Sequence, residues 1–230
     1  MKTIILLVSL LSFSAYCQTA SVILTDTETD ALLSDSIKKR LNLTYPIWRT
    51  YKCTEKTTVS YVLLLESKDS VGANDDTFNK NIKAVKLKST STGLVSEWEI
   101  NDLTQKIINE TSQENSIWFW SKYCLFNDLD KDLAIDPIIV YGTQGTNGFD
   151  DGRIKIVIVY KGKKTIIRHQ NGVLDGDRNT LIDKSFYTLP MSIQTKVKEL
   201  MKQMITNNVA LFPAGWQEGM KKKLVTLKEK

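Results

Sequence analysis

Soft metal ligands are scarce in this sequence of 230 residues, which contains one histidine and three cysteines. No two cysteines stand in a Cys-x-x-Cys arrangement, and the one histidine is His169. Structural zinc sites draw their ligands from cysteine and histidine, usually in closely spaced pairs. The composition therefore argues against a zinc site.

Long hydrophobic runs are also lacking, because after Cys17 no stretch approaches the roughly 18 apolar residues of a membrane-spanning helix. The start of the chain has a different pattern. Lys2 is basic, residues 4–13 form a short apolar core, and small residues follow. This is the layout of a secretory signal peptide. We predict a signal peptide over residues 1–17, a mature chain from Gln18, no membrane span, and a secreted or periplasmic location.

Two alternatives stay open for the start of the chain. An outer-membrane lipoprotein would carry its lipid on Cys17, but such a cysteine follows a small residue and Tyr16 is bulky. An uncleaved, buried strand is the other alternative. If Cys17 leaves with the signal peptide, Cys53 and Cys124 remain. In an exported protein this pair is compatible with one disulfide, and equally with two buried thiols.

Composition indicates an ordinary globular chain. Hydrophobic residues make up 42% and charged residues 25%, so there is enough apolar material for a core. Residues 18–230 are long enough for a single domain. The net charge of +5 is spread along the chain except in the basic tail, residues 221–230, which is typical of a solvated helix end. We expect no nucleic-acid partner, whereas an acidic glycan or a membrane surface stays open.

Apolar periodicity predicts strands that come in hairpins. Alternating segments with turn residues between them are 45–52 with 57–66, 82–88 with 94–100, and 154–160 with 165–169. Further strands are predicted at 117–126 and 138–141, and helices at 26–41, 192–207 and 211–228. Hairpins that do not alternate with helices favour antiparallel sheet. The predicted fold class is α+β, with antiparallel hairpins, a central calcium-loop hairpin and C-terminal helices.

The most informative segment is residues 128–136. Asp128, Asp130, Asp132 and Asp136 occupy positions 1, 3, 5 and 9 of a loop between two predicted strands. Carboxylates at this spacing can converge on one hard cation, and Ca²⁺ takes six to eight oxygen ligands at flexible geometry. We predict a calcium site formed by these four side chains and the carbonyl of Ala134.

Two features of the loop limit this interpretation. An EF-hand would need a glutamate at position 12 and a helix after it, whereas the chain has Ile139 in an apolar strand. The sixth position usually needs a glycine in the left-handed conformation, and here it is Leu133. Keeping that conformation costs roughly 1–2 kcal/mol. The alternative interpretation is a solvated acidic turn in which Asp128 acts as a cap.

Segments 126–141 and 152–160 resemble one calcium-binding blade of the FG-GAP or VCBS type. The shared pattern is an aspartate-rich loop between two strands, then a glycine loop, then a strand that ends in an aromatic residue, here Tyr160. The resemblance covers residues 117–169 and implies a structural Ca²⁺ ion. Blades of this type usually repeat to close a propeller, and only one copy is visible.

Motifs over nearly all of the mature chain also resemble a family of secreted proteins from Bacteroidetes. These motifs are Tyr45-Pro46-Ile47, Trp98-Glu99-Ile100-Asn101-Asp102, Ser116-Ile117-Trp118-Phe119-Trp120 and Ile167-Arg168-His169-Gln170-Asn171-Gly172. Some members carry a label that links them to surface polysaccharide biosynthesis, and similar single-blade proteins include inhibitors of cell-wall hydrolases.

Other candidate sites are weaker. His169 is the only place for a histidine acid–base catalyst, and a lone histidine is more often structural. Trp118 and Trp120 could stack on sugar rings, although core packing is the favoured role. The leading hypothesis is a non-catalytic, calcium-stabilised protein of the cell envelope that binds a protein or glycan partner and is linked to surface polysaccharide. The alternatives are an inhibitor of a cell-wall hydrolase, or a glycan-active enzyme that uses aspartates and His169.

Overall fold

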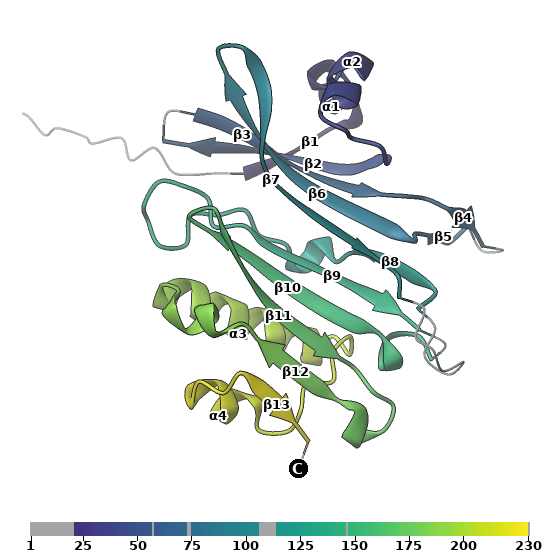
Figure 1. Cartoon of the computed structure of the whole chain (residues 1–230), viewed down its shortest axis with the longest axis vertical. Helices are drawn as coiled ribbons and strands as arrows, with labels where there is room; N and C mark the ends of the chain where they lie inside the picture. The colour runs from purple at the N-terminus through teal and green to yellow at the C-terminus, as the bar shows by residue number, and fades with distance from the viewer. Residues whose placement is uncertain (1–20, 57, 73–74, 106–113, 146, 230) are drawn as a thin grey trace, which may run out of the picture.

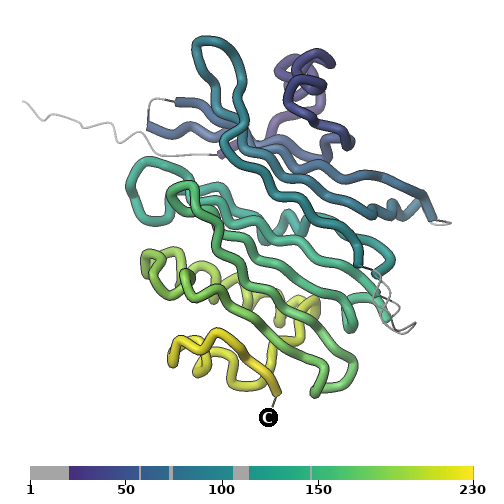
Figure 2. Tube along the Cα trace, in the orientation of Figure 1, coloured from purple at the N-terminus to yellow at the C-terminus, as the bar shows by residue number. Residues whose placement is uncertain are grey.

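Two antiparallel β-sheets lie face to face in the computed structural model, and helices cover the outer face of each sheet (Figure 1). In Figure 2 the strands of both sheets run in similar directions across the view, as in an aligned sheet-on-sheet packing. The structure describes residues 21–56, 58–72, 75–105, 114–145 and 147–229. The predicted signal peptide and Gln18 lie outside the described residues.

The first sheet has the strand order β1-β2-β3-β6-β7. Its strands are β1 Ser21–Leu24, β2 Ile47–Glu55, β3 Thr58–Glu66, β6 Asn81–Thr90 and β7 Gly93–Leu103. The short helices α1 (Asp26–Leu32) and α2 (Asp35–Arg40) lie over its outer face (Figure 1). Leucines from the helical segment and from β3 and β6 fill the space between them, including Leu33, Leu63 and Leu87. A separate two-stranded ribbon consists of β4 Ser70–Val71 and β5 Thr77–Phe78.

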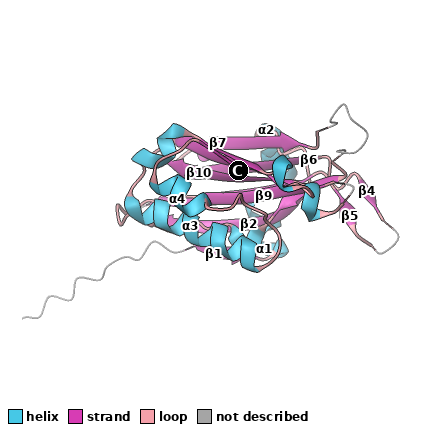
Figure 3. Cartoon of the chain, turned by 90° about the horizontal axis from the view of Figure 1, so that it is seen from below, coloured by secondary structure: helices cyan, strands magenta, loops and turns pink. Residues whose placement is uncertain are grey.

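The second sheet has the order β13-β12-β11-β10-β9-β8. Its strands are β8 Ser116–Phe119, β9 Ile138–Gln144, β10 Arg153–Tyr160, β11 Lys163–Gln170, β12 Asn179–Ile182 and β13 Thr226–Lys228. Helices α3 (Met191–Thr206) and α4 (Trp216–Lys221) lie over its outer face, as Figure 3 shows from below. Short 3₁₀ turns are η1 Ser121–Tyr123, η2 Phe149–Asp151, η3 Asp175–Asp177 and η4 Lys184–Thr188. Among the described residues, no helix combines the length and apolar character needed to cross a membrane.

Side-chain alternation explains why both faces of β10 are apolar. Ile154, Ile156 and Ile158 point to the layer of α3 and α4, whereas Val157 and Val159 pack between the two sheets. Successive residues of a strand point to opposite faces, so a strand covered on both sides becomes a continuous apolar run. The run of residues 156–159 therefore supplies two layers of the core at once.

The predicted α+β class with C-terminal helices is wrong. The structure is 43% strand and 25% helix, with three antiparallel sheets, so it is β-rich. The largest error concerns residues 211–228, where the predicted helix is reduced to α4 and followed by β13, an edge strand paired with β12. Gly215, at φ 70°, precedes α4 in the left-handed conformation, and a helix cannot continue through that conformation.

Two further boundaries differ from the prediction. The helix over 26–41 is divided at Leu33 and Ser34 into α1 and α2, and a capping box between Thr25 and Glu28 begins α1. The strand over 117–126 ends at Phe119, after which the chain turns through η1. The three predicted hairpins are confirmed as the pairs β2–β3, β6–β7 and β10–β11. Segment 117–169 forms β8 to β11, four neighbouring strands of the second sheet.

Cys53 and Cys124 are free thiols, both buried in the layer between the sheets. Of the two alternatives for this pair, the structure thus has the thiols. Burial raises the pKa of each to about 12. The sulfur of Cys124 lies 3.4 Å from the Val140 carbonyl oxygen and donates to it. Both cysteines therefore act as small apolar core residues.

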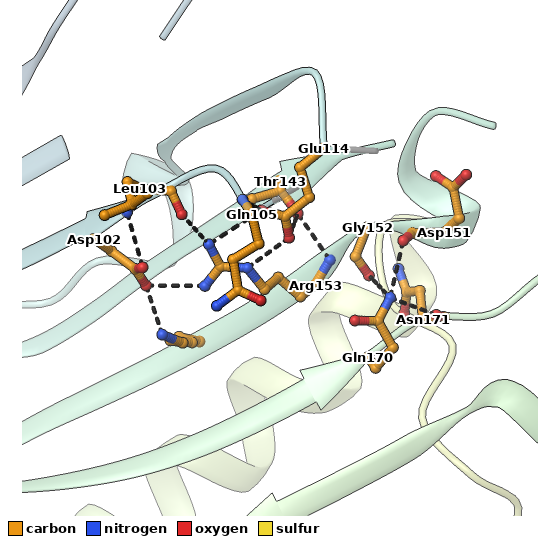
Figure 4. Close-up of polar contacts among 11 residues, drawn as sticks. Asp102, Leu103, Gln105, Glu114, Thr143, Asp151, Gly152, Arg153, Gln170 and Asn171 are labelled. Carbon is orange, nitrogen blue, oxygen red and sulfur yellow. Dashed lines mark hydrogen bonds and ion pairs between the residues drawn. The ribbon is translucent and has the colours of Figure 1, made fainter. Parts of the chain in front are cut away.

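A buried ion-pair network connects the two sheets at one end (Figure 4). Arg153 of β10 donates to the Glu114 carboxylate at 2.5 Å and to Asp102 of β7 at 3.0 Å, and it also donates to the carbonyl of Leu103. Lys155 donates to the same Asp102 oxygen at 2.6 Å. Arg153 and Glu114 are both buried. Each of these charges has a partner of opposite charge or a hydrogen-bond acceptor, and a charged side chain can be buried only when it is paired in this way.

Removing one partner of this network should be costly. In Arg153→Met we expect the free energy of unfolding to fall by about 3 kcal/mol, because Glu114 would keep a buried charge without its arginine. Urea denaturation at neutral pH measures the change. Lys196→Met is the matched control, since Lys196 pairs with Glu199 on the surface of α3, and it should change stability by less than about 0.5 kcal/mol. Equal effects of the two variants would contradict the role given to the network.

Candidate metal centre and the adjoining pocket

The aspartate-rich loop is closed at its base by backbone pairing. Leu125 and Ile138 exchange two hydrogen bonds, at 2.8 Å and 2.9 Å, in an isolated β-bridge. One step further in, the Asp136 N–H donates to the Asn127 carbonyl at 2.8 Å. These contacts hold the two ends of the loop together, so carboxylates that are eight residues apart in sequence come close in space.

The loop brings three of the four predicted carboxylates together. Oxygens of Asp128, Asp130 and Asp136 all lie within 4.8 Å of one another. An all-oxygen set of this kind suits a hard cation such as Ca²⁺, and carbonyls or water would complete the coordination. Asp132 is not part of the group, and Ala134 is exposed and lines the pocket beside the loop.

The same carboxylates also accept backbone hydrogen bonds. Asp128 accepts from the N–H groups of Lys131, Asp132 and Leu133 at 2.6–3.1 Å. Asp136 accepts from Leu129 at 2.8 Å. The loop therefore has the capping role of the acidic-turn interpretation in addition to the grouped carboxylates of the metal interpretation.

Asp136 is the buried member of the group. Burial, together with the negative charges of Asp130 and Asp132, raises the pKa of its carboxyl to about 6, although the backbone hydrogen bonds it accepts act in the opposite direction. The positive charge near Asp136 does not offset the negative charge of the acidic groups around it. A bound cation would supply that charge.

Leu133 adopts the left-handed conformation that its position in the pattern predicted, with φ 70°, and Lys131 does the same at φ 67°. The Leu133 side chain is 39% exposed, so little packing compensates the backbone strain. Its N–H donates to Asp128 at 2.9 Å, which fixes the peptide in this orientation. The sixth position of the loop is thus left-handed although it is not a glycine.

A glycine at position 133 should relieve this strain. We expect Leu133→Gly to raise the free energy of unfolding by about 1 kcal/mol, as measured by urea denaturation. Ala134→Gly is the control, because Ala134 is also exposed but is not among the residues with positive φ. It should lower stability by about 0.5–1 kcal/mol. A loss of stability in both variants would show that Leu133 is not strained.

Residues from other elements complete the surroundings of the loop, and sequence reasoning missed their part in it. Tyr160, at the end of β10, donates its hydroxyl to Asp130 at 2.8 Å. Lys161 in the following turn lies 3.5 Å from Asp132. Glu55 of the first sheet accepts the Ile135 N–H at 3.0 Å and pairs with Lys86. No linear pattern signals these contacts, because the partners lie about 30 to 80 residues from the loop.

A pocket of about 510 Å³ opens beside the loop. The loop forms one wall, with Asp132 and Asp136. The first sheet contributes Lys86 and Trp98, and the β10–β11 turn contributes Lys161. Its walls carry charges of both signs, so it is a polar pocket.

His169 lies in the core, where it bridges strands and loops. It is 2% exposed, and its ring contacts Phe212 at 4.4 Å between centroids. Nε2 lies 2.7 Å from the Asn171 side-chain oxygen and Nδ1 lies 2.9 Å from the Thr180 hydroxyl. The Asn171 oxygen can only accept, so Nε2 carries the proton and Nδ1 accepts. This arrangement stabilises the fold and leaves His169 away from solvent and from a substrate.

Burial lowers the pKa of His169 from 6.5 to about 4. The unfolded chain takes up a proton near pH 6.5, whereas the folded chain does so only near pH 4. The stability contributed by the neutral ring is thus present above pH 6.5 and is lost as the pH falls toward 4, by about 3 kcal/mol. Urea denaturation across this range should show a steeper decline for the wild type than for His169→Gln, which cannot titrate. Parallel curves would contradict the buried, neutral ring.

Other charged residues from η2 to Asp183 form ordinary ion pairs or lie in turns. Arg168 pairs with Asp183 at 2.7 Å, and Asp175 pairs with Arg178. Asp150 is exposed in η2. The structure therefore does not bring these residues to His169 or to the loop.

Comparisons of the chain with protein-family models, with curated proteins and with solved structures found no match. The resemblances to calcium blades and to an exported family thus rest on the sequence motifs alone. What the site does has to be inferred from its own geometry.

Proposed function

We propose that this chain is an exported protein of the cell envelope that has no catalytic activity, holds a structural Ca²⁺ ion in loop 128–136, and binds a protein or glycan partner. The observation that carries the proposal is the convergence of Asp128, Asp130 and Asp136 to within 4.8 Å in one closed loop. Three carboxylates this close repel one another unless a cation lies among them.

The ion acts on stability. The loop connects η1 to β9, and Glu55 attaches it to the first sheet through the Ile135 N–H. A cation that binds only the folded loop stabilises the whole fold by mass action. It also orders the wall of the adjoining pocket that contains Asp132 and Asp136.

A binding function agrees better with the described residues than an enzymatic one. The one histidine is buried and its ring nitrogens are occupied. The leader-like residues 1–17 support export, and the family resemblance supports a link to surface polysaccharide. Inhibition of a cell-wall hydrolase is a special case of the same binding role, with a protein as the partner.

Thermal unfolding of the purified protein with Ca²⁺ and with a chelator tests the ion site. At a Ca²⁺ concentration of about 100 times Kd the stabilisation should be about 2.7 kcal/mol, which corresponds to a rise in Tm of roughly 5–10 °C. Mg²⁺ should give a smaller rise, because it demands a stricter geometry and dehydrates reluctantly.

Matched variants identify the ligands. Asp130→Asn should abolish the Ca²⁺-dependent rise in Tm, since it removes one charge from the group without changing its size. Asp150→Asn, an exposed aspartate in η2, should keep the full rise. An unchanged Tm with Ca²⁺ in the wild-type protein, or the same rise in Asp130→Asn, would refute the calcium site.

A further inference from the structure

A second surface hollow lies around two tryptophans, Trp48 and Trp118. Two pockets of about 560 Å³ and 330 Å³ share Trp48 and Trp118 as lining residues. We call the two together the tryptophan groove. It has no lining residue in common with the pocket beside the aspartate-rich loop. It is thus a separate place where the molecule can hold a ligand.

The fold presents aromatic rings along this groove. Trp118 and Trp120 alternate on β8 and just beyond it, with their ring centroids 6.5 Å apart. Phe149 of η2 meets both indoles edge-on, at 5.7 Å from each. Gly142 makes the arrangement possible, because a Cβ there would lie 2.5 Å from the Trp120 ring. Trp48 and Trp118 remain partly exposed.

Strand β8 is the edge of the second sheet, and two of its outward N–H groups already donate hydrogen bonds. It lies beside β6 of the first sheet (Figure 1). The Ile117 N–H donates to the Asn79 carbonyl at 2.9 Å, and the Phe119 N–H donates to the Glu66 carboxylate at 3.0 Å. A peptide that adds to a sheet edge needs such groups free. This edge therefore does not offer a peptide its usual docking mode.

The polar residues that line the groove suit hydroxyl-rich ligands. The larger pocket is lined by Ser121 and by Asn207, whose amide donates one hydrogen bond to the Tyr123 hydroxyl at 2.7 Å. The smaller one is lined by Gln144 and Thr77. The indole Nε1 of Trp120, a wall residue, is buried and has no hydrogen-bond acceptor among the described residues. Amides and hydroxyls both donate and accept, as sugar hydroxyls require.

The charges of the groove do not favour an ionic ligand. The aromatic pocket is lined by one cationic side chain, Lys122, and by no carboxylate. The smaller pocket is lined by Glu66, which is buried and hydrogen-bonded, and by the exposed Asp76. No concentrated patch of either sign results. An uncharged ligand thus complements both halves of the groove.

We infer that the tryptophan groove binds an uncharged oligosaccharide of two or more pyranose rings, with Trp118 stacked on a ring and amides bonded to its hydroxyls. Flat aromatic faces present large, rigid contact areas, and polar groups beside them fix orientation. The two connected pockets give room for more than one ring. This inference rests on the proposed binding function and names the glycan as the partner.

The test is titration of the purified protein with cellopentaose, xylohexaose, mannohexaose and maltohexaose. Tryptophan fluorescence and calorimetry measure the binding of each sugar. A tryptic digest of casein serves as the peptide probe. At least one of the sugars should bind saturably at or below roughly 10 mM. Trp118→Ala should weaken that binding roughly tenfold or more, while Trp118→Phe, which keeps a flat ring, should bind within about threefold of the wild type.

Trp98→Ala is the matched control, because Trp98 is a partly exposed tryptophan that lines the other pocket. It should leave sugar binding unchanged. Absence of sugar binding, binding of the casein peptides alone, or equal losses in Trp98→Ala and Trp118→Ala would overturn the inference. If the protein binds sugar but Ca²⁺ leaves Tm unchanged, the calcium site alone is refuted. If Ca²⁺ raises Tm but no sugar binds, the groove alone is refuted.

Discussion

Burial of both faces of the central strands β3, β6, β9 and β10 is the constraint on which the rest of this structure depends. The layer between the sheets and the two layers beneath the helices cover these central strands, so few of their side chains meet water. Charges that fall inside these layers therefore need protein partners. Arg153 pairs with Glu114 and, across the two sheets, with Asp102. Glu55 pairs with Lys86 and also accepts the Ile135 N–H of the aspartate-rich loop. The candidate metal centre is thus attached to the core through one of these satisfied charges.

Local patterns in the sequence predict the hairpins well, because alternation and turn residues act over few residues. The same patterns give wrong elements where contacts between distant segments determine the structure, as in residues 211–228. Trp216, Met220 and Leu227 have the spacing of one helix face and do pack in the same apolar cluster. Yet Leu227 reaches that cluster from β13, which pairs with β12. The spacing records which residues are buried, and a short helix followed by an edge strand buries the same residues.

The candidate site shows the same division. The grouping of Asp128, Asp130 and Asp136 was predictable, since one loop holds all three, and so was the strained backbone at Leu133. The contacts of Tyr160, Lys161 and Glu55 were not, because they depend on how β10 and the first sheet come to lie beside the loop. The tryptophan groove could be predicted only in part. Its tryptophans are conspicuous in the sequence, but the partial exposure of Trp118 follows from the edge position of β8, and the place of the buried Trp120 ring depends on Gly142.

The two thiols between the sheets have a consequence for how the folded protein can be purified and stored. Oxidation and disulfide exchange proceed through the thiolate, and neither Cys53 nor Cys124 presents one. The fold of the described residues contains no covalent cross-link that must form before packing is complete. Its native state is accordingly indifferent to the redox poise of its surroundings. The folded protein should therefore keep the same structure in its described residues with and without reductant, because burial protects both thiols.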